Sequence, residues 1–168
     1  MGKFYNREIP LGRLANLITK NYLGVLSQKL NQLDMERHFY PLVLIEQGGG
    51  KITQTELSEA LKTDKVSMVR ILDYLSSQGM IVRQTNPIDR REHYLQVTDK
   101  AKQILPHIKQ AIQEVNSAAL QGFTEEQKDL FYELLGKVCC NLCSLPSEEI
   151  LMEYSRVKNR PNEEKKLD

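Results

Sequence analysis

Two adjacent arginines are the residues whose type and placement most clearly suggest a chemistry. Arg90 and Arg91 follow the polar stretch 86–89, and short runs of alternating apolar and polar residues flank them at 80–83 and 94–97. Such alternation predicts two β-strands joined by a polar loop. Guanidinium groups are attracted into the narrow minor groove of duplex DNA. The pattern therefore indicates a hairpin, or wing, that contacts DNA; a plain surface hairpin with solvated arginines is the alternative.

The base of this hairpin offers further polar contacts. Thr85 and Asn86 stand where the first strand runs into the loop. Their hydroxyl and amide groups can bond phosphate oxygens, which position a protein on a duplex without reading its sequence. We therefore include both among the expected DNA contacts.

A second set of candidate contacts precedes the hairpin. An apolar-periodic segment from about Asp64 to Gly79 follows a shorter helical segment, as in a helix–turn–helix. The N-terminal residues of the second helix of that motif face base edges in the major groove. The planar fork of Arg70 can bond guanine O6 and N7 together, although an ordinary solvated charge is the alternative. The residues expected to face DNA here are Lys65, Val66, Ser67, Val69 and Arg70.

The elements that must position these residues begin and end at recognisable points. Thr53 and Glu56 form a capping box that opens the first helix of the motif, and Asp64 caps the second. Upstream, the spacing predicts a long helix over 9–33 and a shorter one over 37–47 that ends at three glycines.

Two more helices are predicted downstream. Thr98 caps a helix that contains Pro106, where we expect a kink or a curved helix, and that ends at Gly122. Thr124 begins a second capping box and a last long helix that closes before Pro146. A short helix is expected over 147–157, and the remaining tail is charged and aperiodic.

The terminal helices are too long for a small winged domain to cover. Their apolar stripes need a partner, and a second copy of the chain is the simplest one. We therefore expect a homodimer of a mainly α protein with a small β-wing, a winged helix–turn–helix domain plus a helical dimerisation layer formed by the N- and C-terminal helices. The expected divisions are 1–35 (dimerisation), 36–100 (DNA binding), 101–146 (dimerisation) and 147–168 (short helix and tail).

Composition limits the class of protein. Of the 168 residues 40% are hydrophobic and 27% charged, with a net charge of +1, so charge alone does not reveal a nucleic-acid binder. No apolar run approaches the roughly 20 residues needed to span a bilayer. With no secretory pattern at the N-terminus, we expect a cytoplasmic protein and no membrane partner. No phosphate loop, nucleophile elbow or zinc-protease motif is present, so we expect neither an enzyme nor a cofactor.

Three cysteines near the C-terminus allow several interpretations. Cys139 and Cys143 are one helical turn apart, and Cys140 lies between them. Reduced cysteines pack well as small buried hydrophobes, which is the interpretation we favour. Thiol or redox sensing through Cys139 and Cys143 is the alternative, and no nearby histidine completes a metal site, so no metal is expected.

The segment from Leu61 to Leu75, the wing with its Asp-Arg-Arg sequence and the following Leu-Gln-Val-Thr run resemble the MarR family of bacterial transcription regulators. The resemblance is good over about 53–101. It implies a homodimeric repressor, less often an activator, that binds a pseudo-palindromic operator of double-stranded DNA, and possible release by a small anionic or phenolic effector. The relatives that sense peroxide use a cysteine in the first helix, and this chain has none there. Val66, Val69 and Tyr74 depart from the residues common in the family, so the operator sequence does not carry over.

The resemblance also suggests where an effector would bind. His38, Phe39 and Tyr40 open the second helix, close to the effector pocket of the family. Aromatic and titratable groups can meet an anionic ring there, although core packing with a solvated histidine is the interpretation we favour. A winged helix that binds protein is a further alternative, but apolar residues in place of the wing arginines would favour it, and they are absent.

Overall fold

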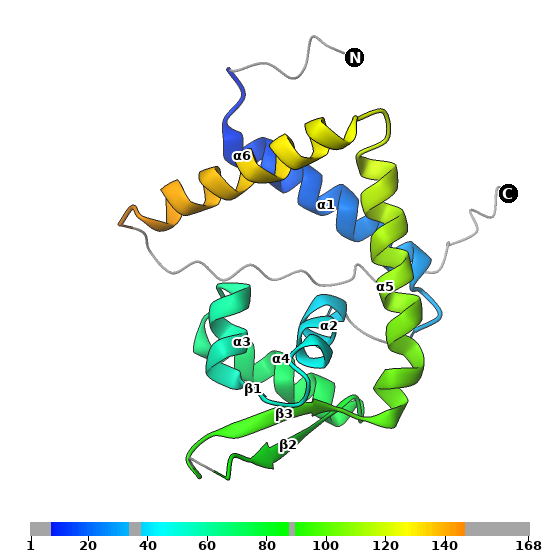
Figure 1. Ribbon diagram of the computed structural model, residues 1–168, viewed down its shortest axis with the longest axis vertical. Coiled ribbons are helices and arrows are strands. Elements are labelled where there is room, and N and C mark those ends of the chain that lie inside the picture. The colour runs from blue at the N-terminus through cyan, green and yellow to red at the C-terminus, as the bar shows by residue number, and fades with distance from the viewer. Residues whose placement is uncertain (1–7, 34–37, 88–89, 147–168) are drawn as a thin grey trace, which may run out of the picture.

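The computed structural model describes residues 8–33, 38–87 and 90–146. Within these ranges the chain forms six helices and a small sheet of three strands (Figure 1). The sheet lies at the end of the molecule opposite α6. In chain order the elements are α1 (Leu11–Lys29), α2 (Phe39–Gln47), β1 (Ile52–Thr53), α3 (Gln54–Leu61), α4 (Lys65–Ser77), β2 (Ile81–Thr85), β3 (His93–Val97), α5 (Asp99–Ala119) and α6 (Glu125–Cys143).

The helix starts predicted from capping residues are confirmed. The side chains of Thr53, Asp64, Thr98 and Thr124 each accept a hydrogen bond from the backbone N–H three residues on. At Thr53 and Thr124 the reciprocal bond is also present, so both capping boxes are complete. A cap satisfies backbone donors that have no partner inside the helix, and it needs only residues close in sequence.

The sheet contains one strand more than the sequence predicted. The hairpin strands β2 and β3 are antiparallel, with Thr85 opposite His93, and β1 adds to the other edge of β3, with Ile52 opposite Leu95. The strand order is β1-β3-β2. A strand of two residues is too short to show alternation, so only the pairing with a distant segment reveals β1.

The glycines after α2 end that helix, whereas Pro106 does not end α5. The glycine loop after α2 turns through positive φ at Gly49 and Gly50, whereas Gly48 is still right-handed. Pro106 lies inside α5, and the helix continues through it as one element of 21 residues. Leu105 and Ile108, on either side of the proline, are buried in the core, and this packing holds the helix together across the missing backbone bond.

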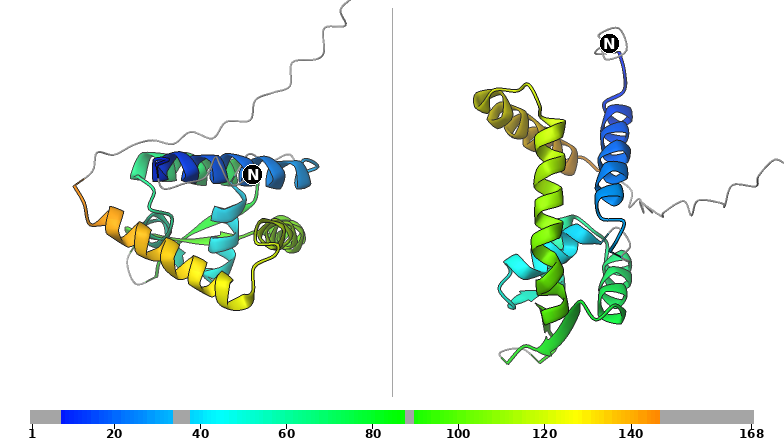
Figure 2. Two further views of the ribbon diagram at one scale, coloured as in Figure 1. Left: turned by 90° about the horizontal axis from the view of Figure 1, so that it is seen from above. Right: turned by 90° about the vertical axis from the view of Figure 1, so that its right-hand side faces the viewer.

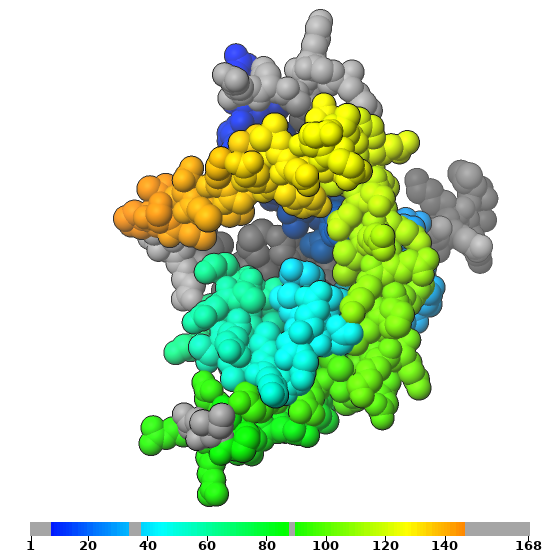
Figure 3. All heavy atoms as spheres, in the orientation of Figure 1, coloured from blue at the N-terminus to red at the C-terminus, as the bar shows by residue number. Residues whose placement is uncertain are grey.

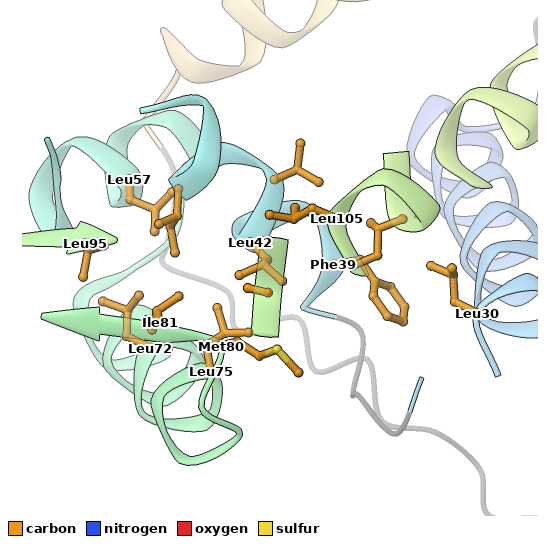
Figure 4. Packing of buried hydrophobic residues seen from close by; sticks show 14 of the residues in the cluster. Leu30, Phe39, Leu42, Leu57, Leu72, Leu75, Met80, Ile81, Leu95 and Leu105 are labelled. Carbon is orange, nitrogen blue, oxygen red and sulfur yellow. The ribbon is translucent and has the colours of Figure 1, made fainter. Parts of the chain in front are cut away.

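One hydrophobic core runs through the winged part of the chain and along α5 (Figure 4). Helix α4 contributes Met68, Leu72 and Leu75, all fully buried. From α1, Leu26 is buried and Tyr22 packs against the cluster, and the C-cap residue Leu30 is also buried. The remaining buried apolar residues are Phe39, Leu42, Val43, Ile45, Leu57, Met80, Ile81, Leu95, Ala101, Leu105, Ile108, Ala111 and Val115.

The last helix contributes nothing to this core. None of the residues of α6 is buried. The space-filling view shows α6 standing away from the winged part below it (Figure 3), and α1 and α5 run side by side (Figure 2). Polar bonds join these two helices: the Tyr22 hydroxyl donates to Asn116 Oδ1 at 2.8 Å, and Lys29 Nζ lies 2.6 Å from Glu114 Oε2.

Candidate DNA-binding surface

Helix α4 separates its apolar face from a solvent face that carries the predicted base contacts. The buried stripe of Met68, Leu72 and Leu75 holds one side against the core. The other side exposes Lys65, Val66, Val69 and Arg70, and Ser67 is half-buried between the two. The structure thus places four of the five residues predicted on this helix together on one exposed surface.

The first turn of α4 is held by its cap. Asp64 Oδ1 accepts a hydrogen bond from the backbone N–H of Ser67 at 2.8 Å. Hydrogen bonds from Ser67, from its side chain first and its backbone second, lower the pKa of Asp64 below its ordinary value. The carboxylate therefore stays ionised at neutral pH and faces the positive end of the helix dipole.

The turn between α3 and α4 has an unusual backbone. Lys62 is left-handed, with φ 48°, and is the non-glycine residue with positive φ in the described part of the chain. Its backbone N–H donates to the carbonyl of Glu59. A side chain in this conformation is strained, and the strain sits at the bend that sets the angle between the two helices of the motif.

The wing positions its arginines at the far end of the hairpin. Arg90 and Arg91 are both exposed and follow directly on the undescribed residues 88 and 89. Thr85 is exposed at the end of β2. These three residues are accessible to a duplex, as the sequence predicted.

Asn86 requires a correction. The residue is 6% exposed, so in this structure it is not presented to a phosphate. Its backbone N–H donates to the carbonyl of Glu92 at 3.0 Å, which closes the hairpin beyond the last strand pair. A loop sequence does not reveal which polar side chain turns inward, because that depends on the twist of the two strands.

A bond that the sequence did not reveal ties the wing to α4. The guanidinium of Arg83 on β2 donates to Asp73 on α4 at 2.7 Å. Neither residue belongs to a motif, and only the packing of the hairpin against the helix brings them together. Since both side chains remain partly exposed, we assign the pair an orienting role and little stability.

A hollow of about 490 Å³ lies between the start of α3, α4 and the wing. Thr55 from α3, Val69 and Asp73 from α4, and Arg91 and His93 from the wing line it. Helix α4 and the wing therefore face the same open space.

The three residues expected at an effector site do not face one space. His38 packs its ring edge-on against Tyr74 of α4, with centroids 5.0 Å apart. Phe39 is 2% exposed and belongs to the core, whereas Tyr40 is 55% exposed. Phe39 therefore packs in the core, and Tyr40, the next residue of the helix, points about 100° away from it.

The cysteines also differ from the favoured interpretation. Cys139, Cys140 and Cys143 are all exposed on α6, so they do not pack inside their own chain. Within the described residues, no cluster of three histidine, cysteine or acidic side chains could hold a metal ion.

Among the helices that the structure describes, none has the length and apolar character of a membrane span.

Comparison with known proteins identifies this arrangement. A model of the MarR family matches residues 36–92, which run from the start of α2 into the wing. The reduced form of MarR from E. coli is 30% identical, with 79% of this chain and 98% of that chain aligned and a TM-score of 0.63.

Two solved complexes with DNA share the fold. A cysteine-to-serine mutant of MarR from E. coli, bound to operator DNA, is 29% identical over 82% of this chain and 99% of that chain, with a TM-score of 0.69. The S. aureus MepR–DNA complex matches the same shares of the two chains with a TM-score of 0.74 at 19% identity, which is a likeness of fold. With its winged helix–turn–helix and its family match, the chain belongs to the MarR family of DNA-binding transcription regulators.

Proposed function

We propose that this protein is a repressor, not an enzyme, that binds a pseudo-palindromic operator as a homodimer and is released by a small anionic or phenolic ligand. Each α4 enters one major groove, and each wing reaches the flanking minor groove through Arg90 and Arg91. The two recognition helices then lie about one helical turn of DNA apart, roughly 34–36 Å. A dimer seated across neighbouring grooves covers a promoter and excludes the polymerase.

We propose a dimer because the apolar surface of the terminal helices is exposed in the single chain. On α6, Leu130, Leu134 and Leu142 are 50–57% exposed, and on α1 Leu11 and Ile18 are 54% and 60% exposed. Contiguous apolar surface of this kind marks an interaction site. A two-fold interface presents the same surface on both copies, so one chain supplies everything that the contact needs.

The contact between His38 and Tyr74 supports control by a ligand. It joins the start of α2 to Tyr74 in α4, which lies four residues after Arg70 and is therefore adjacent to it on the helix surface. A ligand at His38 that favours one position of α4 shifts the population toward or away from the DNA-competent dimer. The exposed Tyr40 can add contacts, while Phe39 would remain in the core.

Binding to promoter DNA tests the function directly. The purified protein is titrated against a duplex from its own promoter region and against a scrambled duplex, each at several salt concentrations. We expect tight binding to the promoter with two chains per site, and much weaker, steeply salt-dependent binding to the scrambled duplex. Equal binding to both duplexes contradicts a sequence-specific regulator.

The dimer is tested by placing one charge in the apolar surface. Leu134→Glu should convert the protein to monomers in sedimentation experiments and reduce operator affinity, because a single half-site remains. Gly136→Glu is the matched control: residue 136 lies on the opposite side of α6, and an added side chain meets no atom within 4 Å. A monomeric wild type, or equal effects of the two charges, contradicts this interface.

Thiol sensing is a second candidate, favoured by the exposure of all three cysteines. Cys139 and Cys143 lie one turn apart on α6, the helix that carries the proposed interface, so their oxidation by peroxide would alter the dimer. We expect peroxide to lower operator affinity of the wild type and to leave a Cys139→Ser, Cys143→Ser double variant unchanged. Equal sensitivity of both proteins excludes this role.

A further inference from the structure

The solvent face of the recognition helix carries two valines. Val66 is 59% exposed and Val69 is 42% exposed. Branched side chains are poor helix formers, and on this face their methyl groups stabilise no core, because the buried stripe lies on the other side of α4. Their exposed apolar surface is available to a partner of this helix.

The neighbours of the valines define what that partner presents. Val66 lies in the first turn of α4, four residues before Arg70, so the two side chains are adjacent on the helix surface. Val69 lines the hollow beside the wing, together with Arg91. A small apolar contact therefore lies beside Arg70 and Arg91, which suits a methyl group on a base of a polyanion.

We propose that Val66, with Val69 beside it, reads the 5-methyl group of a thymine in the major groove. This rests on the proposed binding of operator DNA and specifies its sequence: each half-site contains a T·A pair next to the base pair contacted by Arg70. Thymine is the DNA base that displays a methyl group in the major groove. Polar base edges placed against a valine would lose their water without gaining a hydrogen bond.

The test uses duplexes selected by the protein from a random pool. Each thymine of the selected half-site is replaced in turn by deoxyuridine, which removes the methyl group and keeps the base pairing. We expect one or two positions at which wild-type affinity falls about three- to fivefold, the value of one buried methyl group. Replacing that T·A pair by 5-methylcytosine·guanine should retain more affinity than replacing it by cytosine·guanine.

Variants connect the methyl group to the side chain. Val66→Ala should bind the thymine duplex as weakly as the wild type binds the deoxyuridine duplex, and should show no further loss on deoxyuridine. Val82→Ala is the control: Val82 is 45% exposed, but it alternates along β2 with Arg83, which faces α4, so Val82 points away from the recognition helix. Its variant should respond to deoxyuridine as the wild type does.

The outcomes separate this inference from the proposed function. If no duplex is enriched in the selection, sequence-specific binding itself fails. If duplexes are enriched but no deoxyuridine position weakens binding, or if Val66→Ala and Val69→Ala keep the full methyl effect, then DNA is bound and the thymine contact is wrong.

Discussion

Arg70 and Arg91 differ in what they contribute to the proposed contact with DNA. Arg70 lies on the exposed face of α4, which we propose to face the base edges, whereas Arg91 lies on the wing. A base contact changes the preference for one sequence over another, and a backbone or groove contact changes affinity for most sequences. The two roles can therefore be separated by measurement.

Arg70→Ala should cost about 1–3 kcal/mol of binding free energy on the selected operator and flatten the preference at one base position. The reason is the loss of a bidentate contact with guanine. Affinities for operators mutated at each position measure it, with Arg70→Lys as a control that keeps the charge but not the fork. Unchanged specificity in both variants would make Arg70 a phosphate contact or a bystander.

Arg91→Ala should weaken binding to most sequences and make its salt dependence less steep, because fewer counterions are released. The measurement is the slope of log affinity against log salt concentration. Lys137→Ala removes one positive charge from α6, far from the wing, and should leave the slope as it is. An unchanged slope for Arg91→Ala would show that the wing lies outside the groove.

The cap of the recognition helix should make folding sensitive to acid. Because the pKa of Asp64 is lowered in the folded chain, its carboxylate stabilises the fold above the ordinary carboxyl pKa of about 4. This contribution disappears as the pH falls through the lowered value. Asp64→Asn keeps a capping side chain that does not titrate, so its stability relative to the wild type should rise on going from neutral to acid pH. Denaturant unfolding at a series of pH values checks this, and a constant difference contradicts it.

At the scale of elements, the start of α5 is joined to the end of the recognition helix. The hydroxyl of Thr98 donates to the carbonyl of Gly79 at 2.7 Å and accepts from the backbone N–H of Ala101 at 3.3 Å. The backbone N–H of Thr98 also donates to the carbonyl of Met80. One residue thus caps the connecting helix and fastens it to the turn behind α4.

Thr98→Ala should therefore destabilise the protein by about 1–2 kcal/mol, since it removes a cap and a tertiary hydrogen bond. Thr124→Ala is the matched change, because Thr124 caps α6 in the same way within an exposed segment. Thr124→Ala should reduce the free energy of unfolding by less than Thr98→Ala does. Denaturant unfolding compares the two, and equal losses would mean that the bond to Gly79 adds nothing.

At the scale of the whole molecule, the proposed dimer leaves Cys140 accessible. Leu134, Val138 and Leu142 recur every four residues along one side of α6, and Cys140 lies on the opposite side. In a variant with Cys139 and Cys143 replaced by serine, we expect a thiol reagent to label Cys140 fully without dissociating the dimer. If Cys140 of the native protein did not react with the reagent, the interface would include the face of α6 that carries Cys140, which contradicts the proposed dimer.

Local features were predictable from the sequence for a physical reason. Each capping bond joins residues three positions apart, and the apolar spacing of α4 already separates a buried side from an exposed one that carries Arg70. The winged helix–turn–helix and most of its accessible residues therefore followed from short-range patterns.

Only the tertiary structure decided the features that join distant segments. Four features depend on how the elements pack. They are the pairing of β1 with β3, the burial of Asn86, the bond between Arg83 and Asp73, and the separation of Phe39 from Tyr40. The same holds for α6, whose apolar side remains exposed because the chain folds without covering it. By itself the sequence determined where the described helices form and which of their faces are apolar. Tertiary packing decided whether each face contacts the core, another element or solvent, because burial is a property of the assembled chain.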